Sequence, residues 1–254
     1  SITQTPLNEQ DLKTMSEAVE VLRQFKGFSY FTEMSDIINR LEDHVASARM
    51  KTTPVIDFEK NESLKGLDYL DTIYHAIVNE HPIQLKYRSF KARSANSFIF
   101  YPYLLKEYRN RWFVYGVRGN GRILQNLALD RIQSLEVLPQ EHYIKNTFFD
   151  PNTFFDDLVG VTKNSGSVAE KVGFKVAAAE APYIITKPIH RSQQLVERLP
   201  DGSVILEIEV VINHELERVF FGYVDGIEIL YPKTLVELMS RKLEKAAKQY
   251  TKSK

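Results

Sequence analysis

The sequence predicts an α+β protein in which a helical segment precedes a small β-barrel, and a ferredoxin-like layer of strands and helices follows it. Three observations support this fold class. Apolar residues recur at helical spacing over residues 11–50, and they alternate with polar residues from residue 83 onward. Beyond residue 170 the predicted elements follow the order βαββαβ. We therefore divide the chain into a helical connector and dimerisation region (1–62), a ligand-binding barrel (63–145) and a C-terminal α/β extension (146–254).

Two helices are predicted within residues 11–50, separated by Gly27, and residues 51–62 are expected to form a linker. A third helix should begin at a Ser63 cap. It should end near His81, because the residue before a proline is displaced from the α-helical region. This third helix is expected to lead directly into the barrel.

The barrel is predicted from five short strands joined by tight turns. The pairs Ile83/Gln84 and Leu85/Lys86 begin an apolar-polar alternation that is typical of a half-buried strand. Arg109-Asn110 and the 119–121 segment fall where hairpin turns need residues that tolerate positive φ. Closing such a sheet into a barrel removes its edges. The strands are expected at about 83–88, 98–105, 111–118, 122–129 and 131–138.

The C-terminal extension is expected to begin after a connection rich in Phe, Asp, Gly and Ser over residues 148–167. A proline at position 232 suits the first turn of the last helix. Strands are expected at 171–177, 188–198, 203–212 and 226–230, and helices at 180–186, 214–221 and 232–250.

Composition argues against most enzyme and metal chemistries. The 254 residues include no cysteine, which excludes disulfides, thiolate zinc sites and cysteine nucleophiles. The six histidines form no i, i+4 metal pair, and Gly116, Gly119 and Gly121 lie between strands instead of opening a phosphate-binding helix. We expect no metal, no cofactor and no catalytic activity. With no apolar run of the ~20 residues that a membrane span needs, we expect a cytoplasmic protein.

Positive charge is concentrated in the predicted barrel. Residues 81–131 carry ten Lys or Arg against two acidic residues, a net charge of +8 in a chain whose formal net charge is zero. Aromatic residues alternate with these cations, a combination with which small barrels bind single-stranded nucleic acid. The pattern predicts that the barrel binds an anionic small ligand or single-stranded nucleic acid. The alternative is a solvated basic face over rings that only fill the barrel.

Four runs in this region form a recognisable pattern: Ile83-Gln-Leu-Lys-Tyr87, Tyr101-Pro-Tyr-Leu-Leu105, Arg111-Trp-Phe-Val-Tyr-Gly116 and Leu129-Asp-Arg-Ile132. Together they resemble the WYL domain, a family of domains found in bacterial transcription regulators. The resemblance implies an Sm-like or SH3-like barrel, and residues 171–250 resemble the C-terminal extension of such proteins. Relatives carry an N-terminal winged helix-turn-helix. We find no such sequence after Ser1, so we expect operator DNA to be bound through a domain absent from this chain, as part of a homodimer.

The resemblance also suggests a ligand site. Asp130 is expected to orient Arg131 through a charge-assisted bond, although a structural salt bridge at a barrel corner would explain the pair equally well. The chain departs from the family at Trp112-Phe113-Val114, and it has Gln125 and Ala128 where relatives often carry basic residues. Two other functions stay open: an accessory nucleic-acid-binding module of a defence or helicase system, and an uncharacterised enzyme. The expected phosphate contacts are Arg88, Arg111 and Arg131, and the expected walls or stacking partners are Tyr87, Tyr101 and Trp112.

Overall fold

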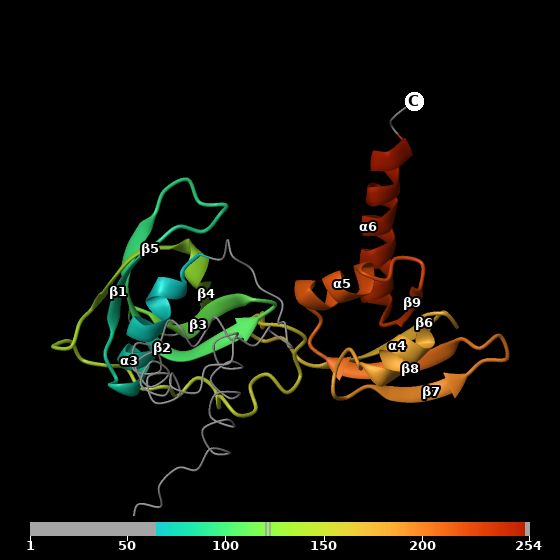
Figure 1. The fold of residues 1–254 in the computed structure, drawn as a ribbon, viewed down its shortest axis with the longest axis horizontal. Helices are drawn as coiled ribbons and strands as arrows, with labels where there is room; N and C mark the ends of the chain where they lie inside the picture. The colour runs from blue at the N-terminus through green and yellow to red at the C-terminus, as the bar shows by residue number, and fades with distance from the viewer. Residues whose placement is uncertain (1–64, 120, 122, 252–254) are drawn as a thin grey trace, which may run out of the picture. The chain divides into compact units, whose positions relative to one another are not determined.

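The computed structural model describes residues 65–119, 121 and 123–251 (Figure 1). The chain divides after Asn146 into two compact units. Each unit has its own antiparallel sheet and a few helices, which confirms the α+β class. The predicted helices within 11–50 and the linker 51–62 lie outside the described residues.

The described part of the first unit starts with a short helical segment, which leads into a five-stranded antiparallel sheet of order β4-β3-β2-β1-β5. The single helix predicted up to His81 is observed as a 3-10 turn followed by an α-helix that ends at Val78. Glu80, two residues before Pro82, adopts a positive φ of 53°, so the helix cannot continue there. The elements are η3 (Leu67–Tyr69), α3 (Leu70–Val78), β1 (Ile83–Tyr87), β2 (Asn96–Tyr108), β3 (Arg111–Arg118), β4 (Leu124–Ala128), η4 (Leu129–Arg131) and β5 (Ile132–Val137).

The hairpin turns lie where the sequence predicted them. Arg109 and Asn110, between β2 and β3, have φ values of 50° and 61°, and Gly119 after β3 has a φ of 57°. Two successive residues in the left-handed region match the twist of the flanking strands. This geometry fixes the register that pairs Tyr108 with Arg111.

The core of the first unit lies between α3 and the sheet. Leu70 and Ile73 of α3 pack with Ile83, Leu85 and Phe100, all fully buried. Burying a side chain of this size stabilises a fold by about 1.5–3 kcal/mol. The alternation that predicted β1 thus places its apolar residues on α3 and leaves Lys86 exposed.

The second unit has a four-stranded antiparallel sheet of order β7-β8-β6-β9. The even positions of β8 from 204 to 210 are buried in the core. The strand predicted at 188–198 is observed only from Gln194, because Gln193 holds a loop before it: its side chain donates to the Ile184 carbonyl and accepts from the Ile189 N–H. The elements are β6 (Glu170–Val176), α4 (Ala181–Thr186), β7 (Gln194–Arg198), β8 (Val204–Val210), α5 (His214–Phe221), β9 (Ile227–Tyr231) and α6 (Lys233–Thr251).

Part of the predicted connection 148–167 is packed into the second unit. Val159 and Val161 are buried there. Asn213, the N-cap of α5, accepts a hydrogen bond from the Leu216 N–H and donates to the carbonyls of Val159 and Thr162. The side chain that caps α5 therefore also fixes this segment on the second unit.

Candidate ligand site at the η4 turn

The centre of the candidate site is η4, the single 3-10 turn between β4 and β5. Leu129 is buried and anchors this turn in the core. Gly66, which precedes η3 with a φ of 85°, lies directly against it: a Cβ added to Gly66 would be 2.4 Å from both the carbonyl carbon and oxygen of Leu129. The backbone of η4 is therefore held from two sides, by its own leucine and by the segment that leads into α3.

Asp130 of η4 draws two arginines together. Its Oδ2 lies 3.3 Å from Nε of Arg111, the first residue of β3, and its Oδ1 lies 3.8 Å from Nε of Arg131. The Asp130 side chain is only 11% exposed, while Arg111 is 44% exposed. The expected charge-assisted bond to Arg131 is not formed, because 3.8 Å is beyond hydrogen-bond length. The nearer partner of Asp130 is Arg111, which comes from another strand.

Two buried atoms at this point lack a hydrogen-bond partner within the described residues: Oδ1 of Asp130 and Nε of Arg131. A buried polar group without such a bond costs about 1–3 kcal/mol. These two atoms lie 3.8 Å from each other, so they form an ion pair without a hydrogen bond. The Asp130 carboxylate assembles the arginines without using all of their hydrogen-bonding capacity.

Tyr87, at the end of β1, joins the same group. It is buried and pairs with Ile132, the residue directly after η4. Burial raises the pKa of Tyr87 above its ordinary value, while the charge of Arg131 and hydrogen bonds with the Ala128 backbone and the Arg131 side chain act in the opposite direction. The phenol is therefore protonated at neutral pH and lies beside the Arg131 side chain.

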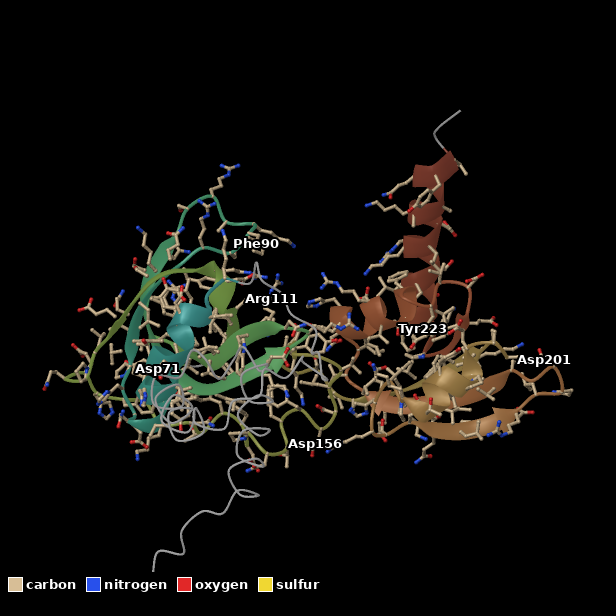
Figure 2. All side chains as sticks on the ribbon, viewed as in Figure 1. Asp71, Phe90, Arg111, Asp156, Asp201 and Tyr223 are labelled. Atoms are coloured by element: carbon tan, nitrogen blue, oxygen red, sulfur yellow. The ribbon has the colours of Figure 1, made fainter. Side chains whose placement is uncertain are left out.

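Phe90, in the β1–β2 loop, was not predicted as a site residue. Cζ of Arg131 lies 4.6 Å from the centroid of its ring, which is a cation–π contact. Figure 2 labels Phe90 in this loop and Arg111 at the start of β3. Because Asp130 links Arg111 to Arg131, one chain of contacts runs from the loop across η4 to β3.

The other predicted site residues have different surroundings. Arg88 is exposed, and its backbone N–H donates to the Arg131 carbonyl at 3.1 Å. Tyr101 contacts the ring of Tyr143 at 6.1 Å between centroids and belongs to an aromatic cluster of its own. Trp112 is half-buried and packs against the core of the first unit. The structure thus gathers Tyr87, Arg111, Asp130 and Arg131 and gives Trp112 a packing role.

Positive charge surrounds this group. The β1–β2 loop, residues 88–95, has no acidic residue and carries three exposed cations, Arg88, Lys91 and Arg93.

Within the described residues, no cluster of three or more histidine, aspartate or glutamate side chains could hold a metal ion. None of the described helices has the length and apolar character to cross a membrane. The chemistry that these residues offer is anion binding by guanidinium groups beside aromatic rings.

Residues 68–137 match the family model of the WYL domain, and residues 169–247 match that of the WCX domain. The chain belongs to the WYL-domain family. This confirms the resemblance found in the sequence. The WYL match covers every element of the η4 site, and the WCX match covers the sheet of the second unit.

Sixteen chains of solved structures also match. They include proteasome accessory factor B/C (PafBC) of Arthrobacter aurescens, at 16% identity and a TM-score of 0.35, with 92% of this chain and 34% of that chain covered. Another is a CRISPR Cas-related protein, at 11% identity and a TM-score of 0.46, with 98% and 89% covered. This chain therefore spans about a third of the PafBC chain. Curated protein sequences give no match.

One departure from the WYL pattern bears on the site. At Ala128, where relatives often have a basic residue, this WYL domain has a buried methyl group, and its backbone lies beside the Tyr87 hydroxyl. Arg111 and Arg131 are the arginines that ion-pair with Asp130. The anion-binding capacity of the turn therefore depends on these two side chains.

Proposed function

We propose that this chain is the ligand-sensing and dimerisation portion of a bacterial transcription regulator, and that its η4 site binds an anionic nucleotide-like ligand or single-stranded nucleic acid. The WYL domain supports the regulatory role. The observation that carries the ligand class is the pair of arginines held around Asp130, whose side chains remain 44% exposed at Arg111 and 28% exposed at Arg131. A guanidinium group fixed in this way is suited to binding a phosphate through two parallel N–H bonds.

The charges around η4 favour an anion over a neutral ligand. Asp130 offsets only one of its two arginines, and the β1–β2 loop adds three exposed cations. A phosphate that approaches Arg111 and Arg131 also releases counterions, which makes its binding sensitive to salt. We propose a binding site without catalytic activity, since Arg111 and Arg131 would position and neutralise an anion.

The contact of Gly66 with η4 offers a route by which binding reaches the segment before the barrel. A Cβ at Gly66 would overlap the Leu129 carbonyl, so the two backbones have no free space between them. An anion that draws Arg131 toward itself shifts η4 and, with it, the entrance to η3. In a regulator this movement would pass to the helical connector and to a winged helix-turn-helix that binds operator DNA outside this chain.

The finer architecture also forms part of the proposal. The edge strands β4 and β5 are joined in sequence through η4, which supports closure of the first sheet into an Sm-like barrel. The order β7-β8-β6-β9, with antiparallel neighbours and α4 and α5 as crossovers, supports a ferredoxin-like layer in the second unit. We further propose a cytoplasmic homodimer, since two-fold operators are matched by two-fold proteins.

Binding of a short labelled oligonucleotide, (dT)8, tests the ligand class by fluorescence anisotropy. We expect Arg131→Ala and Arg111→Ala each to weaken binding by about tenfold, because a hydrogen bond to a charged group contributes about 1.5–3 kcal/mol. Arg198→Ala is the matched control, since Arg198 is an exposed cation on β7 of the second unit. If all three variants bind (dT)8 as the wild type does, the η4 arginines are structural and the proposal fails.

A further inference from the structure

Phe90 is the most exposed of the large hydrophobic side chains in the described part of the first unit, with 72% of its surface open to solvent. It is the second residue of a turn that is closed by a hydrogen bond from the Ala92 N–H to the Ser89 carbonyl. The ring is therefore presented on a closed turn and not on an extended loop. A phenylalanine is more often buried than exposed, so its place at this turn calls for an explanation.

The Arg131 guanidinium covers part of the Phe90 ring. Its Cζ lies 4.6 Å from the ring centroid, and the Nε of the same side chain lies 3.8 Å from Oδ1 of Asp130. The contact orients the ring relative to the two arginines of the η4 site. Because most of the ring is still exposed, a second planar group can stack on it while a phosphate lies in hydrogen-bond reach of the guanidinium.

We propose that Phe90 stacks on an unpaired nucleobase. The η4 site should therefore bind ligands that carry a base next to a phosphate more tightly than it binds anions without a base. This inference rests on the proposed function, since it takes Arg111 and Arg131 as the phosphate contacts. Stacking on an aromatic side chain tolerates any base, because every base has a π-face. The expected ligand class is therefore single-stranded nucleic acid or a nucleotide without a strict base preference.

The surroundings of Phe90 favour a base over a protein partner. Its neighbours on the turn are Ser89 and Lys91, and Arg93 follows closely in the same loop. A protein-docking surface requires a contiguous apolar patch, whereas a single ring among cations is the pattern with which proteins bind single strands. The cations of the loop also suit the phosphates that flank a stacked base.

The test compares two oligomers of equal charge: (dT)4, and a four-residue strand of the same backbone with abasic sites in place of the bases. Binding of both is measured for the full chain and for Phe90→Ala, Phe90→Leu and Phe90→Trp. Loss of one stacked base corresponds to about a 5- to 150-fold loss of affinity. We expect the Ala and Leu variants to bind (dT)4 at least about fivefold more weakly and Trp to bind it at least as well as the wild type. None of the three should change binding of the abasic strand.

Phe90 is exposed, so these variants are expected to keep the melting temperature of the wild type. Equal weakening of both oligomers, or unchanged binding of (dT)4 by Phe90→Ala, would overturn the stacking role and leave the anion site in place. A wild-type chain that binds neither oligomer would instead refute the proposed function. Retained affinity in Phe90→Leu would also overturn the inference, because a leucine is apolar but has no π-face.

Discussion

Replacing Trp112 separates a packing role from a ligand-stacking role. Trp112 is half-buried against the core of the first unit, beside the fully buried Val114. Removing a fully buried tryptophan side chain costs about 3–5 kcal/mol, so about half of that, ~2 kcal/mol, is expected for Trp112→Ala. In a unit of this size each kcal/mol lowers the melting temperature by about 4–8 °C. The first unit of Trp112→Ala should therefore melt about 10 °C lower than that of the wild type.

The assay is a pair of melting curves with an oligonucleotide titration beside them. Trp112 is the only tryptophan of the chain, so its fluorescence reports unfolding of the first unit of the wild type. The variants lack this tryptophan, so their unfolding is followed by circular dichroism or calorimetry. Trp112→Phe is the control, because it keeps a ring in the core and should lose less stability than the alanine variant. A Trp112→Ala protein that melts like the wild type but loses affinity for (dT)8 would refute the packing role and make this residue a stacking partner.

Three further outcomes are expected. Gly66→Ala should destabilise the first unit by at least about 2 kcal/mol, since its Cβ would overlap the Leu129 backbone. Gly119 also has a positive φ but open space around the added Cβ, so Gly119→Ala should cost only about 1 kcal/mol. Equal melting temperatures of the two variants would contradict this. Burial lowers the pKa of His190 below the ordinary histidine value of about 6.5. Below pH 6.5 the unfolded chain therefore binds more protons at this residue than the folded chain does, and the free energy of unfolding of the second unit should fall as the pH decreases. Denaturant titrations from pH 8 to 5 should show a smaller fall for His190→Asn than for the wild type. Sedimentation at tens of micromolar should give a dimer, and a monomer mass at every concentration would exclude it.

Elements of the first sheet were predictable where the sequence carries a local signal. Alternation marked Ile83 to Tyr87, and the Arg109-Asn110 pair marked a hairpin whose φ values are positive as expected. The start of β7 was predicted several residues too early. The reason is that Gln193 bonds to two distant backbone groups, and no period in the sequence reveals such a bond.

The candidate site was only partly predictable, for the same physical reason. Asp130 and Arg131 are adjacent in sequence, so their proximity required no knowledge of the fold. The nearer partner of Asp130 is Arg111, which strand pairing brings from the start of β3. Phe90 stands alone in a polar loop, where it belongs to no periodic pattern, and only the fold places Arg131 over its ring. The family resemblance predicts Tyr101 as a wall of the site, whereas its ring contacts Tyr143.

The central claim is that Arg131 neutralises a phosphate of the ligand, and the salt dependence of binding tests it most directly. For a single strand, the slope of log affinity against log salt falls by about 0.7 for each phosphate contact that is removed. Affinities of (dT)8 for the wild type, Arg131→Ala and Arg198→Ala are measured from low to physiological salt. The account predicts a slope about 0.7 smaller for Arg131→Ala and an unchanged slope for Arg198→Ala. Identical slopes and affinities for all three proteins would show that the ion pair of Asp130 with Arg131 is structural and would contradict the account.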